Sequence, residues 1–137
     1  MIKFSEEQID NFIGLLDFSK IEGHVVPVIA QDYKTNEVLM LAFANEEAMR
    51  QSLKTGIACY FSRSRKKLWK KGEESGHIQE IQHIFMDCYQ DTVLLKVKQK
   101  VAACHTGFYS CFYREYLDGE LITHGEPVFD PEEVYNK

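Results

Sequence analysis

The sequence predicts an α+β fold in which antiparallel strands predominate over a few short helices. Two observations support this class: strand-like segments outnumber helical ones, and the helices do not alternate with strands as βαβ units would. We expect the strands to form a barrel-like sheet. The 137 residues contain no internal repeat and no linker-like stretch, which indicates a single domain over residues 1–137.

The first half of the chain predicts two helices around a hairpin. Ser5 and Gln8 fit the capping-box pattern, and apolar residues at helical spacing extend the first helix to about residue 16. Segments 25–31 and 37–43 are rich in strand formers and flank a polar turn. Asn45 caps a second helix over residues 46–54, which Gly56 ends.

The second half is mostly strand-like. The pattern predicts strands over residues 57–63, 68–70, 78–88, 92–99 and 109–117. Asp130 followed by Pro131 is typical of a cap and a first helical position, so a short helix should end the chain.

Composition excludes a membrane-spanning protein. The longest apolar run, residues 38–44, is far shorter than the ~20 residues that a membrane helix needs, and no secretory signal is visible. We therefore expect a cytoplasmic protein with reduced thiols. Its four cysteines should be core residues, metal ligands or nucleophiles rather than disulfide partners.

Basic residues gather in one tract of an otherwise acidic chain. The net charge is −5, yet residues 62–71 hold six of the basic residues and no acid. This asymmetry favours a small anionic ligand over a long polyanion. Arginine suits phosphate and Trp69 could stack on a base, although a solvated loop or a surface for single-stranded nucleic acid has the same composition.

Two further motifs could bind metal ions. Asp87 and Asp91 flank Cys88 and Tyr89, and if this segment is extended the two acids share one face and could hold Mg²⁺; the alternative is an ordinary Asp-rich turn. Cys88, Cys104 and Cys111 would supply the three protein ligands of a catalytic zinc, or each could be a small buried residue.

Two histidines lie close to these motifs in the sequence. His105 follows Cys104 and could act as a general base, with His77 as the second candidate. Each could equally be a hydrogen-bonded structural residue.

Several long motifs in this order resemble the phosphoribosyl-AMP cyclohydrolase family of histidine biosynthesis, over residues 26–114. They are Ser62-Arg63-Ser64-Arg65, Leu68-Trp69-Lys70-Lys71-Gly72-Glu73 with Ser75-Gly76-His77 and Gln79, Asp87-Cys88 with Asp91, Ala103-Cys104-His105-Thr106-Gly107 and Ser110-Cys111-Phe112-Tyr113-Arg114. The length of the chain favours the form that lacks a fused second domain.

The resemblance implies an intertwined homodimer that hydrolyses the N1–C6 bond of the adenine ring in 1-(5-phosphoribosyl)-AMP. It also implies a zinc ion held by Cys104 and Cys111 of one chain and Cys88 of its partner. The family's magnesium ligands fall on Asp87, Tyr89 and Asp91. Tyr89 departs from the family's acid, and because a neutral phenol is a poor magnesium ligand we expect weak magnesium binding.

The implied zinc ion and substrate together predict a mechanism. A zinc ion lowers the pKa of its water to about 7, and that water would attack C6 of a ring made cationic by alkylation at N1. We expect His105 to move the proton, with His77 second. Arg63, Arg65 and Lys71 would hold phosphates, Trp69 the base, and Ser75 completes the substrate-binding set. The rival classes are a structural zinc protein and a binder of single-stranded nucleic acid.

Overall fold

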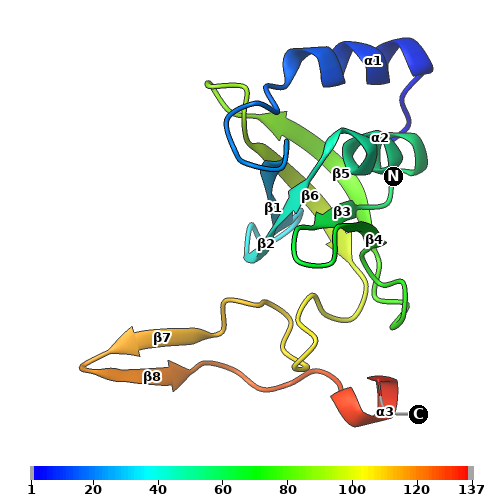
Figure 1. Ribbon diagram of the computed structural model, residues 1–137. Coiled ribbons are helices and arrows are strands. Elements are labelled where there is room, and N and C mark those ends of the chain that lie inside the picture. Colours follow the sequence, from blue (N-terminus) through cyan, green and yellow to red (C-terminus); the bar gives the residue numbers. More distant parts are fainter. Residues whose placement is uncertain (1, 136–137) are drawn as a thin grey trace.

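A computed structural model describes residues 2–135 of the protein. Within this range the chain forms three short helices and eight strands (Figure 1). In chain order they are α1 (Glu6–Leu15), β1 (Val26–Asp32), β2 (Val38–Ala44), α2 (Glu46–Thr55), β3 (Cys59–Ser62), β4 (Lys67–Lys70), β5 (Gln79–Met86), β6 (Val93–Gln99), β7 (Arg114–Leu117), β8 (Glu120–Thr123) and α3 (Pro131–Tyr135). The predicted α+β class is confirmed.

The main sheet is open, so the barrel-like form that the sequence suggested is wrong. Its four strands have the order β2-β1-β6-β5, and β3–β4 and β7–β8 form separate two-stranded hairpins. Four strands are too few to close around a packed interior, which takes about eight. All pairings are antiparallel except that of β1 with β6, which joins the two hairpins of the sheet side by side.

The hydrophobic core lies between the main sheet and the first two helices. Ile9 and Ile13 of α1 and Met49 and Leu53 of α2 pack with Leu95 and the other inward-facing residues of the strands. The predicted caps are present: Ser5 and Gln8 form a capping box, and Asn45 accepts a hydrogen bond from the Ala48 amide. In the part of the chain that the structure describes, no helix is long and apolar enough to cross a membrane.

The C-terminal part stands away from this core. The β7–β8 hairpin projects from the body, and the chain then returns to α3 (Figure 1). The strand expected over residues 109–117 is confined to β7, because the amide of Cys111 instead donates to the carbonyl of Leu39, at 2.7 Å. Strand β8 was not predicted. Every residue of the β7–β8 hairpin is exposed, so no alternation of buried and exposed positions marks it in the sequence.

Candidate active site

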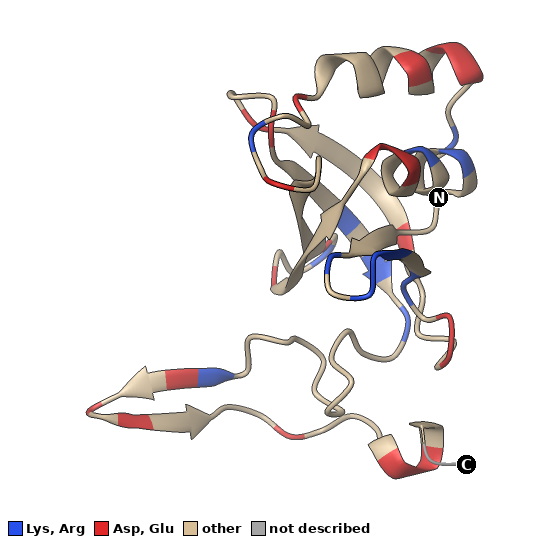
Figure 2. Ribbon diagram, viewed as in Figure 1, with Lys and Arg blue, Asp and Glu red and all other residues tan. Residues whose placement is uncertain are grey.

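An open pocket of about 760 Å³ lies where the β3–β4 hairpin meets the loops after β4 and β6. Basic residues concentrate around this hairpin (Figure 2). The pocket brings together six of the residues that the sequence singled out, namely Arg65, Trp69, Lys71, Ser75, His105 and Cys111. Residues from segments about 40 positions apart therefore share one cavity.

One wall of the pocket is aromatic and cationic. The ring of Trp69 packs on the buried ring of Tyr60, with centroids 5.1 Å apart. The Nζ of Lys71 lies 5.7 Å from the centroid of the Trp69 ring and donates a hydrogen bond to the carbonyl of Ala103. Burial lowers the pKa of Lys71, while the nearby thiols of Cys111 and Cys104 act in the opposite direction.

The loop from Ala103 to Cys111 also lines the pocket, and hydrogen bonds from Tyr109, Ser110 and Cys111 anchor it to the β1–β2 hairpin. The Cys111 amide donates to the Leu39 carbonyl, and the Ser110 hydroxyl donates to the Val38 carbonyl at 2.7 Å. The Tyr109 hydroxyl donates to the carboxylate of Asp32. These bonds hold the loop rigidly against the edge of the sheet.

Asp32 also closes the β1–β2 turn. Its Oδ1 accepts hydrogen bonds from the amides of Lys34 and Thr35, at 2.8 and 3.0 Å. Burial acts to raise the pKa of Asp32, but the bonds from Tyr109 and these two amides outweigh it and hold the pKa below its usual range. Asp32 is therefore a buried carboxylate that keeps the loop in place.

Two of the three predicted zinc ligands lie together in this loop. Cys104 is buried and Cys111 is exposed, yet nearby protein atoms partly desolvate the Cys111 thiol and raise its pKa to about 11; the neighbouring Cys104 thiol adds to the rise, and Lys71 opposes it. The Cys104 Sγ is also 2.9 Å from the Thr106 hydroxyl. Two adjacent thiols beside an ammonium form a partial ligand set for a thiophilic metal.

Cys88 does not join them within one chain. It lies in the turn between β5 and β6, whereas the segment leading to Cys104 leaves the other end of this hairpin, where Gln79 pairs with Gln99. Strand β5 has eight residues, so the two ends are roughly 23 Å apart. Within residues 2–135, no three His, Cys, Asp or Glu side chains lie close enough together to hold a metal ion.

The two candidate histidines have different environments. His105 is exposed and lines the pocket. His77 is buried, and its Nδ1 has no hydrogen-bond partner. Its ring packs edge-to-face with the ring of Phe129, with centroids 4.7 Å apart. Burial lowers the pKa of His77, and the charges of Lys71 and Lys100 lower it further. His77 is therefore neutral near pH 7, and His105 is the one with access to a ligand.

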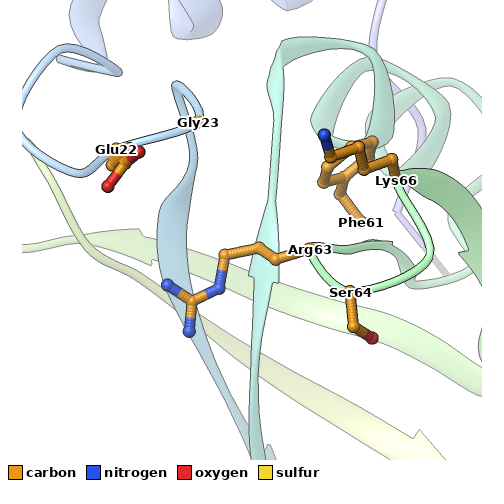
Figure 3. Close-up of a pocket in the computed structure, with 6 residues that line it drawn as sticks. All are labelled: Glu22, Gly23, Phe61, Arg63, Ser64 and Lys66. Atoms are coloured by element: carbon orange, nitrogen blue, oxygen red, sulfur yellow. The ribbon is translucent and has the colours of Figure 1, made fainter.

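The turn between β3 and β4 faces two pockets rather than one. Ser62, Arg65 and Lys67 line the pocket described above. Arg63, by contrast, lines a second pocket of about 890 Å³ together with Ser64, Lys66, Phe61, Glu22 and Gly23 (Figure 3). Its guanidinium carbon lies 3.8 Å from the centroid of the Phe43 ring. The structure thus separates Arg63 from Arg65, which the sequence grouped together.

The acidic segment forms a tight turn, which confirms the Asp-rich turn that the sequence left open as the alternative; the extended segment with alternating faces is not formed. Asp87 Oδ1 accepts hydrogen bonds from the amides of Asp91 and Thr92, at 3.1 and 3.2 Å. Asp91 pairs with the ammonium of Lys20, at 3.0 Å. Tyr89 is 71% exposed. Asp residues satisfy local backbone donors in this way in many turns.

Comparisons with known proteins agree with the motifs in the pocket. Residues 40–113 match the sequence model of the phosphoribosyl-AMP cyclohydrolase family. The phosphoribosyl-AMP cyclohydrolase of Methanoregula boonei is 60% identical over 116 residues, covering 85% of this chain and 92% of the relative. That of Syntrophotalea carbinolica is 54% identical over 123 residues, covering 89% and 98%.

The chain belongs to the phosphoribosyl-AMP cyclohydrolase family. The family expected from the motifs, and with it an enzyme, is therefore confirmed. A third relative, the histidine biosynthesis bifunctional protein HisIE of Thermoanaerobacter pseudethanolicus, is 58% identical over 127 residues, which cover 93% of this chain and 58% of that protein.

Sequence reasoning missed two parts of this cyclohydrolase-family site. Beneath the pocket, the buried Gln79 accepts a hydrogen bond from the Tyr60 hydroxyl at 2.6 Å and donates one to Gln99 at 2.8 Å. Gln79 belongs to one of the family motifs, and that membership was the signal that could have identified it. Tyr135 also lines the pocket, and no motif marks it.

Proposed function

We propose that this protein hydrolyses the N1–C6 bond of the adenine ring in 1-(5-phosphoribosyl)-AMP, which gives the phosphoribosyl-formimino-aminoimidazole carboxamide ribonucleotide. The observation that carries the proposal is that one pocket contains cationic, aromatic, histidine and thiol groups together. The relatives named phosphoribosyl-AMP cyclohydrolase support the same reaction. In this role the protein supplies a step of L-histidine biosynthesis.

The pocket residues have separate roles in this proposal. Arg65 and Lys71 attract the phosphates of the substrate, and Ser75 offers a hydroxyl. Trp69, already fixed against Tyr60, presents a face to the purine. Arg63 lines the other side of the β3–β4 turn, so any phosphate that it binds would lie in the second pocket.

The reaction adds one water molecule across the N1–C6 bond. C6 gains the oxygen and becomes the carbonyl carbon of the carboxamide, while N1 gains a proton as the bond breaks. His105, exposed at the pocket, removes the proton from the water and returns one to N1. His77, buried and neutral, supports the loop that carries Ser75.

Zinc fits the pair formed by Cys111, which lines the pocket, and the neighbouring Cys104 thiol. Cys104 and Cys111 would hold the ion, and Cys88 of a second copy would be the third ligand, because in the same chain Cys88 is at the far end of the β5–β6 hairpin. When bound, zinc lowers the pKa of its water to about 7 and so supplies a nucleophile at neutral pH.

A homodimer with shared sites follows from this ligand set. The projecting β7–β8 hairpin supports the proposal, because Tyr116, Leu117 and Leu121 are exposed on it, and a two-stranded hairpin is marginally stable when nothing covers it. A two-fold dimer would use each such contact twice.

Magnesium fits poorly at the acidic turn of this chain. Asp87 is committed to backbone amides, Lys20 neutralises Asp91, and Tyr89 has no carboxylate. We therefore propose that magnesium binds weakly and mainly together with substrate, whose phosphates supply further oxygen ligands.

The direct test is a spectroscopic assay of purine ring opening in phosphoribosyl-AMP. We expect turnover by the purified protein, its loss when a zinc chelator is added, and its return when zinc is restored. Absence of turnover by zinc-loaded protein would overturn the proposed reaction. Turnover that survives complete removal of zinc would overturn the role of the thiols while leaving the reaction in place.

A further inference from the structure

One residue of the pocket comes from outside the segment that matches the family. All the other lining residues fall within residues 40–113, whereas Tyr135 belongs to α3 near the C-terminus. Tyr135 is 38% exposed at the pocket. An aromatic side chain in this position is free to contact a ligand that enters.

The segment that carries Tyr135 is fixed to the loop from Ala103 to Cys111. The Val128 amide donates a hydrogen bond to the Gly107 carbonyl, at 2.8 Å. Gly107 has φ +103, and a Cβ built on it would lie 2.7 Å from the Phe129 carbonyl oxygen and 3.1 Å from Pro127 Cβ. Only glycine fits such a close contact between two backbones.

The same segment also contacts the loop after β4. The ring of Phe129 packs edge-on against the buried ring of His77. Phe129 in turn lies 6.3 Å from the Tyr135 ring, centroid to centroid, at an angle of 58°. Phe129 therefore links both loops of the pocket to the aromatic ring at its rim.

The local sequence sets the direction of α3. Asp130 Oδ1 accepts a hydrogen bond from the Glu132 amide at 3.0 Å, and Pro131 occupies the first helical position. One turn of helix from this cap brings Tyr135 to the pocket that contains Trp69. The arrangement is built by contacts along residues 127–135.

We propose that Tyr135 contacts the base of the bound nucleotide through its ring and so completes the pocket, with Phe129 as the residue that positions it. This inference rests on the proposed function for the identity of the natural ligand. The binding mode is aromatic contact with the base, for which substitution by alanine costs about 1–3 kcal/mol, equivalent to roughly 5- to 150-fold in affinity.

Binding is measurable without catalysis, because Trp69 is the single tryptophan of the chain and lines the pocket. With AMP as the probe, titration of Trp69 fluorescence gives a Kd for each variant. We expect Tyr135→Ala to raise this Kd about tenfold and Tyr135→Phe to retain wild-type binding, since the ring carries the contact. Glu133→Gln, exposed on the same helix, is the control and should bind as wild type.

Kinetics with phosphoribosyl-AMP separate binding from folding. Tyr135→Ala should raise KM by the same factor as the Kd and leave kcat within about twofold of wild type. Phe129→Ala should raise KM at least as much, because it frees α3. An unchanged Kd and KM in Tyr135→Ala would overturn the inference, as would a loss in Tyr135→Phe equal to that in Tyr135→Ala, which would assign the contact to the hydroxyl.

These outcomes are distinguishable from failure of the proposed function. If wild-type protein binds AMP through Tyr135 but does not open the purine ring, the reaction is wrong and the nucleotide contact stands. If wild-type protein turns over normally and Tyr135→Ala matches it in KM, the reaction stands and the contact is wrong.

Discussion

The two ends of the β5–β6 hairpin differ in how many of the predicted site residues each brings together. At one end, anchored loops gather Arg65, Trp69, Lys71 and Cys111 in one pocket, with the Cys104 thiol next to Cys111. At the other end, Cys88 is exposed in a turn whose acids are occupied by backbone amides and by Lys20. Both ends carry family motifs, and the pocket described above lies at the first of them.

The shared site proposed above would account for this difference, because the motif residues would then serve separate copies of the chain. The loop from Ala103 to Cys111 is held by bonds to Leu39, Val38 and Asp32, so Cys104 and Cys111 are held in place within one chain. The turn at Cys88 is also closed by hydrogen bonds, and Cys88 is exposed on it. Its exposure leaves the Cys88 thiol open to a second copy, as the proposed shared site requires.

The largest effect should come from the thiol pair. We expect Cys104→Ser to lose its zinc, about one ion per chain, and more than about 100-fold in turnover, beyond the ~10–100-fold that residues around a metal ligand contribute. Cys59→Ala, which removes a buried thiol outside the pocket, is the matched control and should keep both the zinc content and the turnover of the wild type. Metal analysis and the ring-opening assay provide the measurements; normal turnover by Cys104→Ser would remove zinc from the mechanism.

The bond that anchors the loop from Ala103 to Cys111 should have a moderate, pH-dependent effect on stability. Tyr109→Phe removes the bond to Asp32 and should lower the free energy of unfolding by about 1–3 kcal/mol at pH 7. Because the pKa of folded Asp32 lies below its unfolded value of about 3.9, this stabilisation is present above that pH and is lost as pH falls through the folded pKa.

Urea unfolding at pH 7 and at pH 3 measures this effect. The difference between wild type and Tyr109→Phe should shrink at the lower pH, while Tyr33→Phe in the neighbouring turn serves as the control. A difference that is the same at both pH values would show that the Asp32 carboxylate does not anchor the loop.

The smallest effect should come from the acidic turn. Tyr89→Asp adds a carboxylate beside Asp87 and Asp91, so the magnesium concentration that gives half-maximal activity should fall. The measurement is activity against magnesium concentration for the two proteins. An unchanged magnesium dependence would mean that Tyr89 does not limit metal binding.

Sequence reasoning predicted the residues of the pocket better than their arrangement. Trp69, Lys71, His105 and Cys111 were found because long motifs carry them, and the pocket contains all four. The separation of Arg63 from Arg65 was not predictable, since it depends on the path of the β3–β4 turn, where Lys66 adopts a positive φ of 52°.

Other features depended on contacts between distant parts of the chain. The sequence left open whether Asp87 belongs to an extended segment or to an Asp-rich turn, and its carboxylate closes a turn by accepting hydrogen bonds from two amides of the same segment. Tyr135 reaches the pocket only because residues 127–129 dock on Gly107 and His77. Strand β8 forms by pairing with β7 at the surface, where no buried face imposes an alternating pattern.

Mixing two inactive mutants tests whether each site draws ligands from two chains. Cys88→Ala and Cys111→Ala homodimers should each lack activity. After the two proteins are unfolded together and allowed to re-pair, about half of the random pairs are heterodimers, and each has one site with three intact thiols.

We therefore predict recovery of roughly a quarter of the wild-type activity, with refolded wild-type protein as the reference. If all three ligands came from one chain, every site in the mixture would carry a lesion. Recovery of no activity, while the reference refolds normally, would contradict the shared site.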